Sequence, residues 1–195
     1  LSTIDWLITQ LERDRGLDTG MIDLIPIIET GRGLAAVENV AHAPHRVRRL
    51  SFGAGDFSLD MNIRWTMEEH ELDYARAKIA TASRAARLES PLDTVFIHLG
   101  MLEGLRSSSE RARNFGFQGK LCIHPEQIEP VNQVFSPSSE EIEQAQKYVD
   151  AFKAAEASGS ASIQVEGYFI DYPIVEKAQR TLDVAKAIEQ SGRGV

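Results

Sequence analysis

The chain has 195 residues, of which 43% are hydrophobic and 26% are charged, and its formal net charge is −8. This composition is typical of a globular protein with one sizeable core, and the acidic balance argues against nucleic acid or an anionic membrane as the main partner. No apolar run reaches the roughly 20 residues that a membrane helix needs, and the N-terminus lacks the features of a signal peptide. Cys122 is the single cysteine and cannot form an internal disulfide, so we expect a reducing, cytoplasmic compartment.

Helices and strands are expected to alternate along residues 1–136. In chain order, the hydrophobic pattern predicts a helix at 1–15, a strand at 24–28, a helix at 33–43 ending before Pro44, a strand at 49–52, a Gly-, Asp- and Asn-rich loop, a helix at 67–88, a strand at 94–99, a helix at 103–114, a strand at 120–123 and a helix at 125–134. Alternation of this kind indicates right-handed βαβ units and a parallel sheet, hence an α/β fold.

The pattern changes after Pro137. A helix is expected at 138–157, a loop with a small hairpin at 159–167, and a last helix at 173–189. We therefore divide the chain into a β/α part at 1–136 and a helical and hairpin extension at 137–195. Four strand–helix units make half of an eight-unit barrel, which usually needs about 250 residues. Because a lone half barrel would expose two sheet edges, we expect an N-terminal half to precede this sequence.

Two carboxylates follow apolar runs at points where strands should end. Glu29 comes after residues 24–28, and Asp56 comes after residues 50–55. A carboxylate at the edge of an apolar core needs a partner or a metal, and chemistry is placed at the C-terminal strand ends of parallel barrels. Two oxygen ligands suit Mg²⁺. Glu29 alone could equally cap the following helix. We expect Asp60 to be a loop or cap residue rather than a ligand.

Four stretches carry a resemblance to a known family: LIPIIET at 24–30, LSFGAGDF at 50–57, GFQGKLCIHPEQI at 116–128 and GYFIDYP at 167–173. In order and spacing the chain resembles the HpcH/HpaI aldolase/citrate lyase family, specifically its citrate lyase β-subunit-like branch. The resemblance implies a (β/α)8 TIM barrel, of which this chain is roughly the C-terminal half, followed by the extension. It also implies a lyase that cleaves or forms a C–C bond in citryl, malyl or citramalyl thioesters, giving acetyl-CoA, or its carrier-protein equivalent, and an oxo acid.

The resemblance assigns a metal and an oxo-acid site. By the family's pattern, Glu29 and Asp56 bind Mg²⁺, which chelates the oxo acid. The backbone of Gly53, Ala54, Gly55 and Asp56 is expected to receive the carboxylate of the oxo acid, since glycines allow close approach.

The resemblance also assigns residues beyond the metal site. His124 and Pro125 lie on the strand end that faces the CoA side of the pocket, and Lys120 either faces a phosphate or is solvated. Asp171 is expected to reach a neighbouring subunit's site and to move a proton at the acetyl methyl carbon. A homo-oligomer, a trimer or hexamer, follows from that exchange.

Some features depart from the family or stay open. The family usually carries an acidic residue after the third strand, where this sequence has Gly100 and Met101, so the oxo acid is not assigned. The family's substrate-binding arginine belongs to the N-terminal half, and no residue here takes its role. Arg46, Arg48 and Arg49 are interpreted as a solvated basic turn. Two alternatives remain: a class II pyruvate-type aldolase acting on free hydroxy-oxo acids, and a non-catalytic subunit or interaction protein of the same fold.

Overall fold

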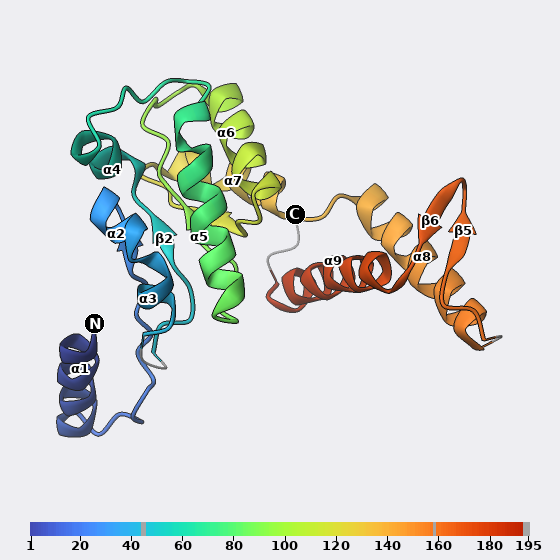
Figure 1. Ribbon diagram of the computed structural model, residues 1–195, viewed down its shortest axis with the longest axis horizontal. Coiled ribbons are helices and arrows are strands. Elements are labelled where there is room, and N and C mark those ends of the chain that lie inside the picture. The colour runs from blue at the N-terminus through green and yellow to red at the C-terminus, as the bar shows by residue number, and fades with distance from the viewer. Residues whose placement is uncertain (44–45, 158, 193–195) are drawn as a thin grey trace. The chain divides into compact units, whose positions relative to one another are not determined.

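The computed structural model describes residues 1–43, 46–157 and 159–192, and it divides into two compact units, Leu1–Phe135 and Ser136–Val195 (Figure 1). Pro44, the expected stop of the second helix, lies outside the described residues. Among the helices described, none combines the length and the apolar character that a membrane span requires. Each unit is described by itself below.

The first unit is built on a parallel sheet of four short strands in sequence order. The strands are β1 (Ile27–Ile28), β2 (Ser51–Phe52), β3 (Leu92–Asp93) and β4 (Gly119–Lys120). Ile28 pairs with Phe52, and Asp93 pairs with Lys120. Because neighbouring strands are parallel and consecutive, helices must connect them, which confirms the predicted βαβ units.

Helices before, between and after the strands complete the first unit. They are α1 (Ser2–Asp14), α2 (Gly31–Ala35), α3 (Val37–Ala41), α4 (Ala54–Asp60), the 3₁₀ helix η1 (His70–Leu72), α5 (Asp73–Ala85), α6 (Leu102–Asn114), the 3₁₀ helix η2 (Pro125–Gln127) and α7 (Ile128–Phe135). In Figure 1, α3 lies against α5, and α6 lies against α7. The core is apolar, with Val37, Leu50, Phe52, Leu72 and Ile79 fully buried.

Several predicted boundaries were wrong, for identifiable physical reasons. The expected helix at 67–88 is shorter because Glu69 and Arg87 both take left-handed backbone conformations, with φ of 54° and 59°, which an α-helix cannot contain. The expected helix at 33–43 is two short helices, α2 and α3. The expected loop after residue 52 contains α4. The third strand is Leu92–Asp93 and not 94–99, because a search for apolar runs does not include the charged Asp93, and the fourth strand is Gly119–Lys120 and not 120–123.

A buried ion network explains how charged residues can occupy those strands. Arg76 donates to both carboxylate oxygens of Asp93 at 3.0 Å and to Glu69 at 2.6 Å, while Lys120 donates to Asp93 at 2.6 Å and to Ser108 at 2.9 Å. Burial opposes ionisation of Asp93, but Lys120 and Arg76 outweigh it and hold the pKa of Asp93 below its usual value. Lys120 therefore neither faces a phosphate nor is solvated, and both sequence interpretations of it were wrong.

Arg46 corrects a second sequence interpretation, that of a solvated basic turn. Its side chain is 3% exposed and donates to both carboxylate oxygens of Glu12, at 2.7 and 2.9 Å, and to Asp5 at 2.8 Å. The Arg46 hydrogen bond is the largest influence on Glu12 and lowers the pKa of its carboxyl from 4.5 to about 2. These contacts attach α1 to the segment before β2. Arg48, in contrast, is 60% exposed, as expected.

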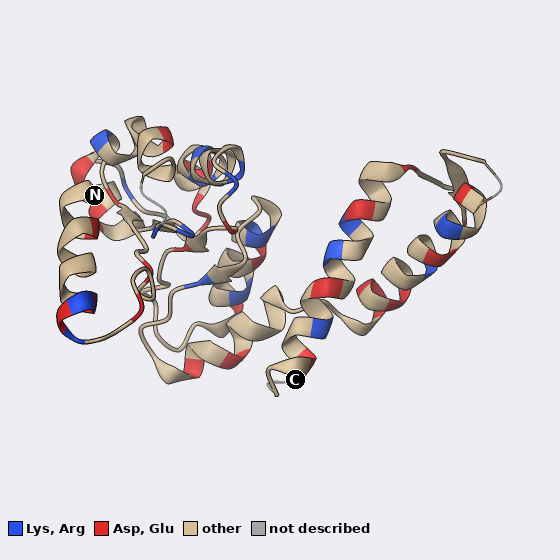
Figure 2. Ribbon diagram, turned by 90° about the horizontal axis from the view of Figure 1, so that it is seen from below, with Lys and Arg blue, Asp and Glu red and all other residues tan. Residues whose placement is uncertain are grey.

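The second unit consists of two long helices and a hairpin. Its elements are α8 (Ser139–Ala157), β5 (Ile163–Val165), β6 (Tyr168–Ile170) and α9 (Tyr172–Gln190). The predicted helices are confirmed, and the predicted hairpin is present but extends to Ile170, beyond its expected end at residue 167. Glu166 and Gly167 form the hairpin turn with φ of 51° and 87°, as a two-residue type I′ turn requires. Buried Ala145, Val149 and Ala178 hold α8 against α9. Acidic and basic residues are interspersed along both helices (Figure 2).

Candidate active site

The C-terminal ends of the first strands bring Glu29 next to Gly53. Ile28 pairs with Phe52, and the Gly53 amide donates to the Ile28 carbonyl at 3.0 Å, so the residues that follow the two strands lie side by side. A Cβ built on Gly53 would lie 2.8 Å from Cβ and 3.1 Å from Oε2 of Glu29. The half-buried Glu29 side chain therefore lies over Gly53, in space that any larger residue at position 53 would occupy.

Asp56 is not at a strand end, as the sequence suggested, but in the first turn of α4. Strand β2 ends at Phe52, and Gly53 is already the residue that precedes the helix, because the chain turns sharply there. Asp56 is exposed. The structure thus places Glu29 against the start of the short helix that carries Asp56, and both carboxylates belong to the same edge of the sheet.

Glu29 is not the cap of the following helix, which was its alternative role. Thr30 takes that role, since its hydroxyl accepts from the Gly33 amide at 2.9 Å. The Gly31 amide donates to Asp60 Oδ2 at 2.8 Å, which confirms Asp60 as a capping residue. Within the described ranges, no hydrogen bond or ion pair engages the carboxylates of Glu29 and Asp56. Both carboxylates are therefore available to an added cation.

The backbone that precedes and begins α4 is partly occupied. The Gly53 amide is bound by Ile28, and the Ala54 amide donates to the hydroxyl of Thr94 at 2.9 Å. Of the four positions predicted to receive a carboxylate, those of Gly55 and Asp56 lie in the first turn, where a helix supplies no internal acceptor. A ligand carboxylate at this turn would therefore use the amides of Gly55 and Asp56.

We expect Gly53→Ala to destabilise the first unit by about 1–3 kcal/mol, because the new methyl group would overlap the side chains of Glu29 and Ile27. Gly55→Ala is the matched control: its nearest neighbour is Trp65 at 3.8 Å, an ordinary contact, and Ala favours a helix. We expect that variant to gain about 0.4–1 kcal/mol. Urea unfolding measures both. Equal stabilities of the two variants would show that the side chains of Glu29 and Ile27 do not need this space.

His124 and Pro125 begin η2. His124 Nδ1 accepts from the Glu126 amide at 3.3 Å, and Pro125 occupies the first helical turn, where its missing N–H costs nothing. His124 also lines a cavity of about 10 Å³ between the start of η2, the segment before α6 and the start of α6. That volume holds about one water molecule, but the His124 side chain is 43% exposed and so remains accessible from solvent.

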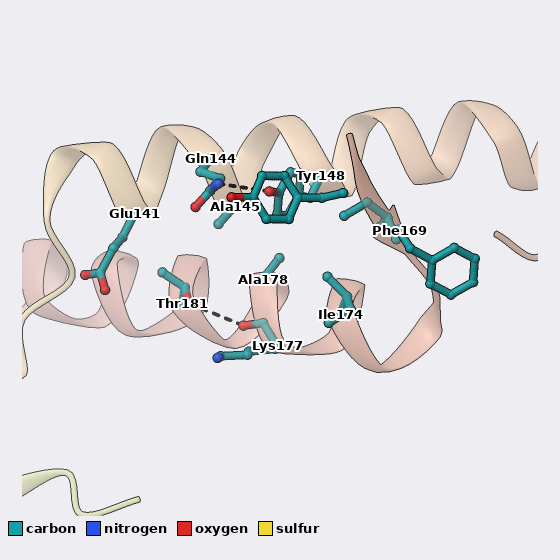
Figure 3. A pocket seen from close by; sticks show the side chains of 11 residues that line it. Glu141, Gln144, Ala145, Tyr148, Phe169, Ile174, Lys177, Ala178 and Thr181 are labelled. Atoms are coloured by element: carbon teal, nitrogen blue, oxygen red, sulfur yellow. Dashed lines mark hydrogen bonds between the residues drawn. The ribbon is translucent and has the colours of Figure 1, made fainter. Parts of the chain in front are cut away.

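Asp171 lies in the second unit, at the junction of β6 and α9. Its carboxylate caps α9 by accepting from the Ile174 amide at 3.3 Å. A separate hollow of about 290 Å³ lies between α8, β6 and α9. Figure 3 shows Gln144 and Tyr148 on the α8 side of it, joined by a hydrogen bond of 2.9 Å, and Ala178 on the α9 side.

The chain's relationship to known proteins agrees with these features. A family model described as HpcH/HpaI aldolase/citrate lyase matches residues 1–125. The chain belongs to this family. The citrate lyase subunit beta of Leuconostoc mesenteroides subsp. cremoris is 35% identical over 184 residues, which is 94% of this chain and 61% of that protein. The chain thus spans about three fifths of the length of this family relative.

Solved structures of family members share the fold. A citrate lyase from Burkholderia xenovorans LB400 matches with a TM-score of 0.78 and 25% identity, over all of this chain and 61% of that one. CitE from Mycobacterium tuberculosis, solved with magnesium, acetoacetate and coenzyme A, matches with a TM-score of 0.71 and 26% identity, over 84% of this chain and 61% of CitE. The predicted fold is confirmed: the chain is α/β, and its four-stranded unit is part of a TIM barrel.

Sequence reasoning missed one residue of the candidate site in this chain. Thr94 is buried, at 1% exposure, and binds the start of α4. The signal that could have found it is its neighbour Asp93, since a charged residue in an apolar stretch usually marks a place where two elements are joined through polar groups. Among the described residues, no three His, Cys, Asp or Glu side chains are arranged to hold a metal, so any ion at Glu29 and Asp56 would need further ligands from water or substrate.

Proposed function

We propose that the protein containing this chain is a Mg²⁺-dependent carbon–carbon lyase. Its substrate would be a 3-hydroxyacyl thioester such as citramalyl-, malyl- or citryl-CoA, cleaved to acetyl-CoA and an oxo acid, or formed from them. Membership of the HpcH/HpaI aldolase/citrate lyase family supports the reaction class. Its relatives include a citrate lyase subunit and a CitE protein solved with magnesium and coenzyme A, which supports the choice of Mg²⁺ and of CoA as the acyl carrier.

The observation that carries the proposal is the unpaired carboxylate of Glu29, which lies over Gly53 beside the turn of Asp56. This donor set fits Mg²⁺, a hard cation that is usually held by one or two carboxylates and completes its shell with water and substrate oxygens. Glu29 and Asp56 would hold the ion. Bound there, Mg²⁺ supplies Lewis-acid polarisation of the oxo-acid oxygens. Thr30 and Asp60 leave Glu29 available, because they cap α2 in its place.

The start of α4 would position the other end of the oxo acid. Amides of Gly55 and Asp56 point from a helix start that has no internal acceptors, and they would hold the substrate carboxylate. Gly53 and Ala54 contribute as framework, since their amides are already bound by Ile28 and Thr94. His124 and Pro125 would border the CoA side as a fixed backbone corner.

In this proposal, Asp171 of a neighbouring subunit transfers the proton at the acetyl methyl carbon. Asp171 is half-buried at the β6–α9 junction, where its hydrogen bond to Ile174 fixes the carboxyl group. General acid–base catalysis needs a carboxyl held in one place in this way. The proposal therefore includes a homo-oligomer, a trimer or hexamer, in the cytoplasm.

The test is acetyl-CoA release by the full-length protein from citramalyl-, malyl- and citryl-CoA, with Mg²⁺ and after chelation with EDTA. We expect metal-dependent release from at least one thioester. We also expect CoA at 100 times its Kd to stabilise the protein by about 2.7 kcal/mol, seen as a higher melting temperature. Cleavage of free hydroxy-oxo acids with no CoA shift would favour the class II aldolase instead. A folded protein with neither activity would leave only a binding or assembly role.

A further inference from the structure

Helix α4 is held at its start by a residue from the next β/α unit. Thr94 follows β3, is 1% exposed, and its hydroxyl accepts from the Ala54 amide at 2.9 Å. Ala54 is the first residue of α4, and the residue before it, Gly53, has no side chain with which to cap the helix. Because the first amides of a helix need acceptors from outside it, Thr94 does what a capping residue normally does, across 40 positions of sequence.

The chemistry of Thr94 suits its neighbours. Glu29 and Asp56 already place two carboxylates near the start of α4. An Asp as the cap would add a third negative charge, which repels the other two and competes for any cation. A hydroxyl accepts the same hydrogen bond without charge. The position thus favours a neutral acceptor.

Thr94 is fixed in place by its own strand. The preceding residue, Asp93, is fully buried and is held by Arg76 and Lys120 at 2.6–3.0 Å. A backbone anchored by two buried cations has little freedom to shift. The hydroxyl of Thr94 is therefore an acceptor held in a fixed position for the first amide of α4.

The other end of α4 is held by the preceding β/α unit. Asp60 is the last residue of α4, and its Oδ2 accepts from the Gly31 amide at 2.8 Å. Gly31 follows Glu29 by two positions. The helix that carries Asp56 is consequently attached at one end to the end of β3 and at the other to the segment that carries Glu29.

We propose that Thr94 and Asp60 are positioning residues that set the place of Asp56 relative to Glu29, and so the affinity of the pair for Mg²⁺. This inference rests on the proposed function. Neither residue is proposed as a ligand of the ion; each would act through the backbone of α4 or α2. Groups that orient metal ligands typically change metal affinity by 10–100-fold when they are removed.

The test uses Mg²⁺ itself as the probe, in the full-length protein, with calorimetry for affinity and hydrogen exchange for the Ala54 amide without metal. We expect Thr94→Val to speed exchange at Ala54 and to weaken Mg²⁺ binding about 10-fold. Thr94→Ser keeps the hydroxyl and should restore both. Thr81→Val is the matched control, because the Thr81 hydroxyl bonds only its own helix at Ala77 and is exposed.

A second pair of variants covers the case in which Thr94→Val does not fold. Asp60 is exposed, so Asp60→Ala should fold and still weaken Mg²⁺ binding, whereas Asp60→Asn retains an acceptor for Gly31 and should bind nearly as the wild type does. Unchanged affinity in Thr94→Val and Asp60→Ala, or a Thr94→Ser variant as weak as Thr94→Val, would overturn the inference. A wild-type protein that binds no Mg²⁺ would instead overturn the proposed function, and the inference with it.

Discussion

Replacing Asp93 with Asn is expected to lower the free energy of unfolding of the first unit by about 3–5 kcal/mol. Asp93 is fully buried and is the shared partner of Arg76 and Lys120, whose side chains are also fully buried. The amide keeps the volume of the carboxylate but not its charge. Two cations would then remain in the interior with Glu69 as the one carboxylate of the network, and desolvation of an uncompensated charge is costly.

The control for this effect is Asp23→Asn, the same chemical change in an exposed ion pair of the same unit. Asp23 and Arg48 are 2.9 Å apart, and their side chains are 43% and 60% exposed. We expect that variant to lose less than about 1 kcal/mol. Urea unfolding followed by tryptophan fluorescence reports on this unit, since both tryptophans, Trp6 and Trp65, belong to it. Similar small losses in the two variants would mean that the buried network contributes little.

The features that sequence reasoning predicted correctly are those that depend on local pattern. The order of strands and helices follows from alternation of short apolar runs with helical periodicity. Local signals also predicted the helices at 138–157 and 173–189 and the hairpin between them. Amphipathic periodicity and turn residues are both recognised from residues that are close together in the sequence. The strand-end rule directed attention to Glu29, and the structure places it against Gly53, at the expected edge of the sheet.

The features that sequence reasoning did not predict depend on residues that are far apart in the chain but in contact in the fold. Asp93 meets Arg76 at 17 positions and Lys120 at 27, so a search for apolar runs began the third strand after Asp93 and could not show that Lys120 is buried. The left-handed conformation of Glu69 is rare outside glycine, asparagine and aspartate, and no local pattern announces it. Thr94 became a candidate only when the fold showed that its hydroxyl meets α4. Such cross-unit contacts are decided by tertiary structure.

Glu29→Gln and Asp56→Asn are each expected to lower kcat/KM for thioester cleavage by at least about 100-fold. Lewis-acid stabilisation of the transition state is worth several kcal/mol, and each 1.36 kcal/mol corresponds to a factor of about ten in rate. Both changes keep side-chain volume. Glu29 makes no hydrogen bond or ion pair with other described residues, so its loss should leave stability nearly unchanged. Glu38→Gln, an exposed acid on α3, is the control and should retain full activity.

The double variant decides whether the two carboxylates act as one site. If Glu29 and Asp56 hold the same ion, removing the first already removes most of the benefit, and the second change should add little to the loss. Independent roles would instead multiply the two losses.

Calorimetric titration with Mg²⁺ gives the same comparison without substrate: each single variant should bind at least about 10-fold more weakly, and the double variant should show no binding. Wild-type affinity in both single variants would show that the ion is held elsewhere. The amides of Gly55 and Asp56 could then still bind the oxo acid, because that contact does not depend on either carboxylate.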